Sequence, residues 1–382
     1  LGQSNYNTDF IADTLLKNAD AVVRFSHTSY KRISAGKFIQ EVHYAITILN
    51  PNGKRAGDLF INYDRNSKVS QIKGFLYDKK GILLRKVNKK EIRDEVLNNE
   101  YTLYSDNRVM TFVPLVSRYP FTVEYKYSIE ETSIVGFETW VPQQGLNVAL
   151  EEAVLSFTTP LIYDIRYKSL NYPFNYNCNQ SQIEKIHTWS AKGIKPIKHE
   201  SNMPNYLDFM PSGLLSPNEI DFEGTIGDFS TWESYGKWTY NLILNRDELP
   251  AKTEKYIKAL TDTIYEKKEK IKAIYKFMQS RTRYVNIALG LGGFQPILAQ
   301  VVDEKGYGDC KALSNYTKAL LKCAGIESYY TEIGSGENQE IKFTDFASAN
   351  QTNHIILCVP ADNDTVWLEC TNQKAPCGFI SS

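Results

Sequence analysis

The sequence lacks any run of the roughly 18 apolar residues that a membrane-spanning helix needs, and it lacks an excess of either charge. Lys plus Arg (44) equal Asp plus Glu (44), so no overall field attracts nucleic acid or an anionic membrane. Six Cys in a chain of 382 residues exclude a small disulfide-stabilised scaffold. We therefore expect no membrane span and no nucleic-acid partner, and the oligomeric state is left open.

Methionine is scarce (4), whereas Tyr (25) and Phe (18) are abundant. This bias favours strands and extended polar-aromatic surfaces over helical bundles. Apolar residues make up 42% of the chain and charged residues 23%, which is typical of folded globular proteins. Because 382 residues exceed what one hydrophobic core usually serves, we expect two domains.

The first 200 residues predict an all-β domain. A short helix is expected first, within residues 1–20, because apolar side chains recur at helical spacing after Thr8. Segments that alternate or nearly alternate apolar and polar residues then follow, separated by turn sequences such as Asn-Pro-Asn-Gly at 50–53. The main segments are 22–25, 42–49, 59–63, 72–77, 121–129, 149–157 and 163–167. We interpret residues 21–200 as an antiparallel β-sandwich and the polar, proline-containing stretch 201–235 as a linker.

A different periodicity begins at Pro250 and indicates a second domain, which we place at residues 236–382. Apolar residues between 256 and 278 recur every three or four positions, which predicts a helix or a helix pair. A short strand at 283–287 and a glycine-rich loop at 289–296 follow. The loop fits neither G-x-x-x-x-G-K nor G-x-G-x-x-G, so we expect its glycines to let backbone approach a cleft rather than to hold phosphate.

Cys310 is the residue best placed for chemistry, because it begins a predicted helix that ends at Gly325. Four side chains share one face of this helix: Leu313, Tyr316, Leu320 and Cys323. The free N–H groups and the positive dipole at a helix start favour a thiolate over a thiol. The neighbouring Lys311 is expected to add to this effect.

A base for this cysteine is expected at His354, the one of five histidines that follows Cys310. His354 opens an apolar strand, and a second strand after a turn leads to Glu369. A two-residue loop at 361–362 or at 362–363 places His354 and Glu369 on one face of this hairpin, directly opposite in the first case and diagonal in the second. A three-residue loop without a bulge would separate them.

These residues predict a nucleophile (Cys310), a general base and acid (His354) and an orienting carboxylate (Glu369). Each has a structural alternative when taken alone: a buried apolar thiol, a hydrogen-bonded strand histidine and an edge-strand carboxylate. Their order and the elements that carry them favour the joint interpretation. We expect no metal site, because His354 and Cys358 form a single pair without a second half.

Three motifs resemble those of the bacterial transglutaminase-like superfamily of papain-like cysteine enzymes: Gly-Asp-Cys-Lys at 308–311, Asn-His at 353–354 and Trp-Leu-Glu-Cys-Thr at 367–371. In that family these segments carry the nucleophile, the base and the third member of a triad. The family's third segment reads hydrophobic-Asp-Pro-Thr. This chain departs from it with Glu369, which is one methylene longer than Asp, and with Cys370.

The resemblance extends to the approach to the catalytic helix, through Tyr284 and the Gly-Phe-Gln-Pro stretch at 293–296. It implies Gln295 and Tyr284 as candidates for the cleft or the oxyanion site, alongside the backbone N–H of Cys310. In all, it covers residues 240–371 and implies an α+β papain-like core that follows an all-β domain of unassigned function.

Proteins with this arrangement are often exported by bacteria, so the resemblance also implies a periplasmic location. The chain starts at Leu1 without Met, which fits either removal of a signal peptide or trimming for expression. Relatives usually continue into a further small β-domain, so a fragment is one interpretation of a chain that ends at Ser382.

The sequence therefore predicts cysteine-dependent acyl transfer to, or hydrolysis of, amide or peptide bonds through a thioester on Cys310, without a metal or an organic cofactor. The acceptor is water in a peptidase or amidase and an amine in a cross-linking enzyme, and analogy with the family favours hydrolysis. Expected substrates are peptides, proteins or amides linked to cell-wall glycans. The alternative, which the substitution at Glu369 keeps open, is a catalytically weak core beside an aromatic-rich β-domain that binds a peptide or a glycan.

Overall fold

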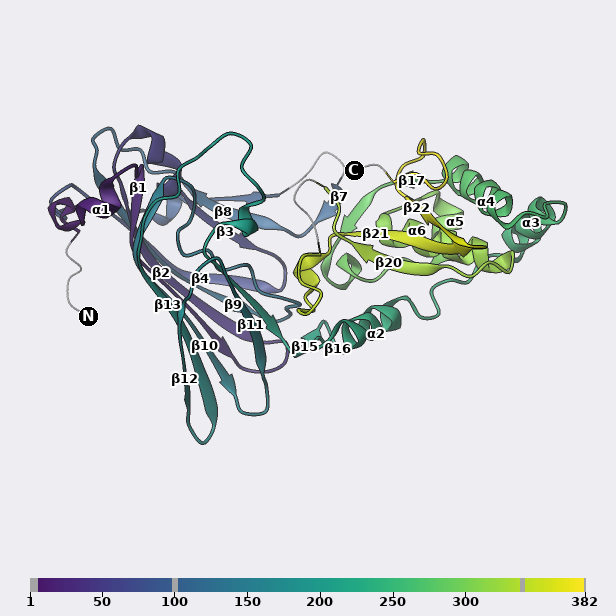
Figure 1. Cartoon of the computed structure of the whole chain (residues 1–382), viewed down its shortest axis with the longest axis horizontal. Coiled ribbons are helices and arrows are strands. Elements are labelled where there is room, and N and C mark those ends of the chain that lie inside the picture. The colour runs from purple at the N-terminus through teal and green to yellow at the C-terminus, as the bar shows by residue number, and fades with distance from the viewer. Residues whose placement is uncertain (1–5, 98–101, 337–340, 381–382) are drawn as a thin grey trace. The chain divides into compact units, whose positions relative to one another are not determined.

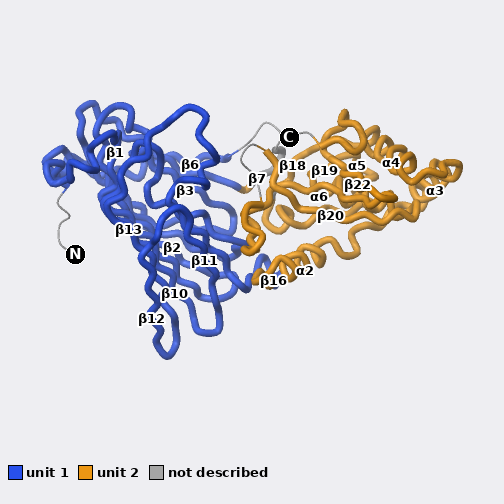
Figure 2. The backbone as a smooth tube through the Cα atoms, viewed as in Figure 1, with its two compact units in different colours: residues 1–97, 107–226 blue, residues 98–106, 227–382 orange. Residues whose placement is uncertain are grey.

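The computed structural model describes residues 6–97, 102–336 and 341–380, and the chain divides into two compact units (Figure 2). Unit 1 comprises Leu1–Leu97 and Asn107–Ile226, and unit 2 comprises Asn98–Asp106 and Gly227–Ser382. Strand β7 (Thr102–Ser105) belongs to unit 2, where it pairs with β18 (Asn286–Ala288). None of the helices in the described ranges is long and apolar enough to cross a membrane.

Unit 1 is built around an eight-stranded mixed sheet with the order β12-β13-β10-β1-β2-β9-β4-β5 (Figure 1). Its strands are β1 (Ala21–Arg32), β2 (Phe38–Ile48), β4 (Ser67–Tyr77), β5 (Leu83–Lys86), β9 (Phe121–Glu131), β10 (Val148–Pro160), β12 (Asn175–Gln180) and β13 (Glu184–Ile194). Neighbouring strands run antiparallel except β1 and β10, which are parallel.

Smaller sheets complete unit 1. They are β3 (Leu59–Tyr63) with β8 (Arg108–Phe112) and β6 (Arg93–Val96), β11 (Ile165–Leu170) with β14 (Ser212–Pro217), and β15 (Glu219–Phe222) with β16 (Thr225–Asp228). Four of these small strands contribute buried side chains to the core of the large sheet: Leu59, Phe112, Ile165 and Leu215. The apolar residues of the alternating segments thus meet in one core, as period-two patterns require.

A β-rich first half is confirmed, but the expected antiparallel sandwich is corrected to a large mixed sheet that carries smaller sheets. The connection at 132–147 brings the chain back to the end of the sheet at which β9 begins, so β10 starts there and runs parallel to β1. Alternation of apolar and polar residues indicates a strand but does not fix the direction of its partner.

Two other expectations differ from the structure. The stretch 201–235, expected to be a linker, contains β14, β15, β16 and the start of α2 (Trp232–Ile243), because its prolines and polar residues separate short strands. The expected N-terminal helix is limited to the 3-10 turn η1 (Thr8–Phe10) and to α1 (Asp13–Leu16). Residues 1–5 lie outside the described ranges.

Unit 2 is built around one central helix, α6 (Cys310–Cys323) (Figure 1). The helix pair predicted after residue 250 is confirmed as α3 (Ala251–Thr261) and α4 (Lys267–Arg281). The remaining elements include α5 (Ala299–Lys305), the sheet β20 (Tyr329–Ile333), β21 (His354–Ala361) and β22 (Asp364–Leu368), and the short pair β17 (Arg283–Tyr284) with β19 (Tyr307–Gly308).

Helix α6 is buried on nearly every side. The predicted apolar face is confirmed for Leu313, Tyr316 and Leu320, which are fully inaccessible. Ser314 and Asn315, on other sides of the helix, are buried as well. A helix packed on all sides is held rigidly, so its first residue has a fixed position.

Candidate active site

Cys310 is the first residue of α6, as predicted, and its side chain is half-buried. Asp309 caps the helix, because its carboxylate accepts the backbone N–H of Ala312 at 2.9 Å. Position 308 needs glycine, since a Cβ there would lie 2.8 Å from the Cβ of Ala312. The helix ends at Gly325, which has a φ of +70°. The thiol therefore lies at the positive end of a well-capped helix.

Lys311 does not supply a free positive charge to the thiol. Its Nζ forms a buried ion pair with the Asp309 carboxylate, and the two side chains are only 8% and 5% exposed. This finding corrects the expectation that Lys311 adds to the activation of Cys310, because Asp309 offsets its charge within the same turn. The helix start remains the source of positive potential at Cys310.

His354 and Glu369 are joined by the predicted hairpin of β21 and β22. Ala361 pairs with Asp364, so the loop has two residues and starts at Asp362. This is the second of the two predicted registers, in which Glu369 is the diagonal neighbour of His354. The Nε2 atom of His354 lies 2.8 Å from Oε2 of Glu369.

Glu369 is 9% exposed, and its carboxylate is fixed at both oxygens. Its Oε1 atom accepts the backbone N–H of Thr371 at 2.9 Å and the Thr371 hydroxyl at 2.6 Å. The Tyr275 hydroxyl donates to the Glu369 backbone carbonyl at 2.6 Å. Burial acts to raise the pKa of Glu369, but the hydrogen bonds from His354 and Thr371 outweigh it and lower the pKa. Sequence reasoning missed the role of Thr371, although its i+2 spacing is typical of local side-chain caps.

The pKa of His354 depends on both the Cys310 thiol and the Glu369 carboxylate. Burial acts to lower the pKa of His354, but hydrogen bonds with Cys310 and with Glu369, together with their charges, raise it to about 9. The imidazole is therefore protonated at neutral pH. A cysteine that interacts with a protonated histidine is the arrangement that activates a thiolate nucleophile.

Asn353, the other residue of the Asn-His motif, fixes the start of β21. Its Nδ2 donates to the backbone carbonyl of Ser335 at 2.9 Å, and its Oδ1 accepts the backbone N–H of Ser335 at 2.7 Å. These two hydrogen bonds to Ser335 set the position at which His354 enters the sheet.

The two residues proposed for the cleft differ in how the structure relates them to Cys310. Tyr284 pairs with Gly308 in the β17–β19 ladder, two residues before the cysteine. Burial, followed by the charges of Cys310 and Asp309, raises the pKa of Tyr284 to about 12, so its phenol is neutral. Gln295 lies after the 3-10 turn η5 (Gly290–Gly293), where its backbone N–H donates to the Leu291 carbonyl at 2.8 Å. A role for the Gln295 side chain stays a prediction.

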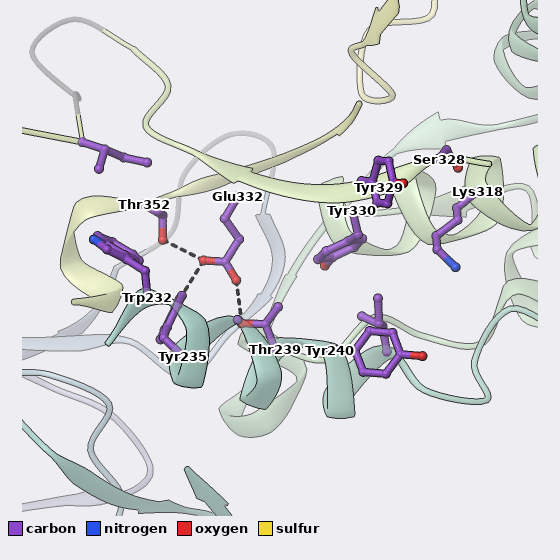
Figure 3. Close-up of a pocket in the computed structure, with 13 residues that line it drawn as sticks. Trp232, Tyr235, Thr239, Tyr240, Lys318, Ser328, Tyr329, Tyr330, Glu332 and Thr352 are labelled. Carbon is purple, nitrogen blue, oxygen red and sulfur yellow. Dashed lines mark hydrogen bonds between the residues drawn. The ribbon is translucent and has the colours of Figure 1, made fainter. Parts of the chain in front are cut away.

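A cavity of about 370 Å³ lies between α2 and β20 (Figure 3). Aromatic side chains of both elements line it: Trp232, Tyr235, Tyr240, Tyr329 and Tyr330. Glu332 lies among them and accepts three hydroxyl groups, from Tyr235 at 2.6 Å and from Thr239 and Thr352 at 2.9 Å each. Sequence reasoning missed this cavity, because Trp232 and Tyr235 fall in the expected linker.

The cavity adjoins the strand that carries His354. Ile333, next to Glu332 in β20, pairs with His354 in β21. Burial, followed by the charges of Cys310 and Glu332, raises the pKa of Tyr330 well above its usual range, so its phenol is neutral. An apolar cavity with a few fixed polar groups is typical of a small-molecule or side-chain binding site.

Comparison with known proteins finds a family model that is similar to part of unit 1. Residues 34–198 match the model described as "Domain of Unknown Function with solved-structure structure (DUF3857)". No curated protein matches the chain.

The solved structures include one of the same fold. A "putative protease" from Parabacteroides distasonis superposes with a TM-score of 0.68 at 15% identity, over 94% of this chain and 68% of that one. A "putative cysteine protease" from Cytophaga hutchinsonii covers 89% of this chain and 78% of its own at 9% identity, but its TM-score of 0.25 is too low to establish a shared fold. The distant structural neighbours thus include proteins described as proteases, without a specific activity.

Proposed function

We propose that this chain is a cysteine-dependent hydrolase of amide or peptide bonds. One observation carries the proposal: His354 is hydrogen-bonded to the fixed carboxylate of Glu369, and against the effect of burial its pKa is raised by Cys310, at the start of a buried helix, and by Glu369. The histidine is charged at neutral pH, which favours a thiolate partner. The resemblance of the three motifs to the transglutaminase-like superfamily agrees with this assignment.

The proposed reaction has two steps. The Cys310 thiolate attacks the amide carbonyl carbon, His354 gives its proton to the leaving nitrogen, and the C–N bond breaks to leave a thioester and a free amine. Water then attacks the thioester while His354 takes one of its protons. The C–S bond breaks, the carboxylic acid leaves, and the thiolate and the protonated histidine are restored. Glu369 holds the imidazole in one orientation throughout.

The oxyanion that forms in each step needs donors that are already in place. The backbone N–H of Cys310 is one of the N–H groups at a helix start that have no partner within the helix. We propose this group as the first donor and the Gln295 side chain as the second. We propose that the cavity beside β20 accepts a substrate side chain.

Peptides, proteins and amides linked to cell-wall glycans are the substrate classes that fit this chemistry. Water is the proposed acceptor. If an amine took the place of water as the acceptor, the same thioester would give a cross-linked product.

Treatment with iodoacetamide at pH 6, followed by mass spectrometry, tests whether Cys310 is an activated nucleophile. An ordinary thiol with a pKa of about 8.5 is almost entirely protonated at this pH and reacts slowly. We expect Cys310 to be labelled at least about tenfold faster than the other five cysteines. Exposed Cys178 serves as the internal reference, and burial raises the pKa of Cys323, Cys370 and Cys377. Equal and slow labelling of all six cysteines would contradict the proposal.

A further inference from the structure

A second cavity, of about 340 Å³, lies in unit 1 on one face of the large sheet. Its floor is formed by alternate residues of two paired central strands: Ser26, Thr28 and Tyr30 of β1, and Gln40, Val42 and Tyr44 of β2. The ladder pairs Ser26 with Tyr44 and Tyr30 with Gln40, so these side chains lie on the same face. The volume falls within the range of small-molecule sites, about 300–1,000 Å³.

Polar residues interrupt the floor where the strand pattern requires apolar residues. On the same face of β2, Phe38 and Ile46 are fully buried in the core of unit 1. Between them, Gln40 is only partly buried, and its amide donates to the Tyr30 hydroxyl at 2.7 Å. Ser26 is 5% exposed on the facing strand. Polar residues at core-facing positions beside unfilled space are typical of a functional site rather than of a packed core.

Two residues that line the cavity each carry a buried polar atom that lacks a hydrogen-bond partner among the described residues: Oδ1 of Asp58 and Nε1 of Trp140. Trp140 is 9% exposed, and Asp58 follows the 3-10 turn η2 (Pro51–Gly57). Burial raises the pKa of Asp58, although Lys54 and Arg55 oppose the shift. An unpaired acceptor and an unpaired donor at one cavity cost free energy that a bound hydroxyl compound would recover.

The rim carries charges of both signs. Glu138 and Arg55 are exposed at the cavity, and with Asp58 they give two carboxylates against one guanidinium. Burial, followed by the charge of Glu138, raises the pKa of Tyr30 and of Tyr127, and all three residues line the cavity. Because Lys54 also acts on Asp58, the two carboxylates face two cations, and this near balance favours a neutral ligand.

We propose that this cavity binds a neutral saccharide. Sugar hydroxyls both donate and accept, so they can pair with carboxylate, amide and indole groups at once, as Asp58, Gln40 and Trp140 offer. The apolar faces of sugar rings pack on aromatic rings, which Tyr44 and Tyr127 supply. This assignment concerns unit 1 alone and does not depend on the chemistry proposed for Cys310.

Isothermal titration calorimetry of the full chain tests the proposal with four probes: maltotriose, triacetylchitotriose, trigalacturonic acid and tetra-alanine. We expect saturable one-site binding of at least one neutral trisaccharide, and no binding of the anionic trisaccharide or of the peptide. Absence of binding by both neutral trisaccharides would overturn the proposal, and so would binding of tetra-alanine in their place.

Three variants locate the binding. Asp58→Asn and Trp140→Phe each alter one unpaired polar group, and we expect each to weaken saccharide binding by about tenfold. The control is Glu41→Gln. Glu41 is exposed, and its side chain points to the face of β2 opposite the cavity that Gln40 lines. It should bind as the parent chain does. Unchanged unfolding temperatures would show that the variants fold. Equal affinity of Asp58→Asn, Trp140→Phe and the parent chain would overturn the proposal.

Discussion

Replacing Cys310 with alanine is expected to lower kcat/KM for a fluorogenic peptide amide by at least about 10⁴-fold. The sulfur is the atom that forms the thioester, and neither His354 nor Glu369 replaces it as a nucleophile. The rate of hydrolysis is measured from the fluorescence of the released fluorophore, and the unmodified chain is measured in parallel.

The same substitution should leave thermal stability nearly unchanged. The Cys310 side chain is half-buried, so its removal leaves little empty volume in the core. Cys323→Ala, at the other end of α6, is the matched control and should keep full activity. A large fall in the unfolding temperature of Cys310→Ala, together with intact turnover, would instead assign Cys310 to the core.

Replacing Glu369 with glutamine is expected to reduce kcat by up to about 10⁴-fold, because the imidazole loses the carboxylate that orients and charges it. The hydrogen bond and the negative charge of Glu369 both raise the pKa of His354 to about 9. Their removal should therefore lower that pKa. Since His354 must carry a proton to protonate the leaving amine, activity of the unmodified chain should fall as the pH rises through about 9.

The pH–rate profile checks this prediction. The alkaline limb should lie near pH 9 in the unmodified chain and move to lower pH in Glu369→Gln. Glu327→Gln is the control, because Glu327 is an exposed carboxylate of the same unit. An alkaline limb that stays in place in Glu369→Gln would mean that another group controls it.

The parts of the site that follow local rules were predictable. A helix start at Cys310 follows from the apolar spacing behind it and from Gly325 beyond it. The shared face of His354 and Glu369 follows from the parity of a hairpin loop, since either two-residue turn gives that result. The structure selects the diagonal register, with a loop that starts at Asp362.

The parts that depend on distant segments were not predictable. Nothing in the alternation of β1 or β10 distinguishes a parallel partner from an antiparallel one. β7 belongs to unit 2 through its pairing with β18, about 180 residues along the chain, and no local pattern signals such a partner. The ion pair of Lys311 with Asp309 was missed for another reason: the sequence shows two opposite charges but not their burial.

The cavities of both units were also not predictable, because each depends on segments that are distant in the sequence. In unit 1, Ser26 and Gln40 interrupt an otherwise apolar face, but the interruption is visible only when the register of β1 and β2 is known. In unit 2, Trp232 and Tyr235 line a cavity because α2 packs beside β20. The tyrosine-rich composition indicated polar-aromatic surfaces without locating them.

A thioester on Cys310 is the central claim, and trapping it is the most direct test. The chain is mixed with p-nitrophenyl acetate, quenched in acid within seconds and analysed by intact mass and by peptide mapping. We predict one acetyl group, located on Cys310 and absent from Cys310→Ala. Acetylation spread over several residues, or an equal amount on Cys310→Ala, would contradict the account.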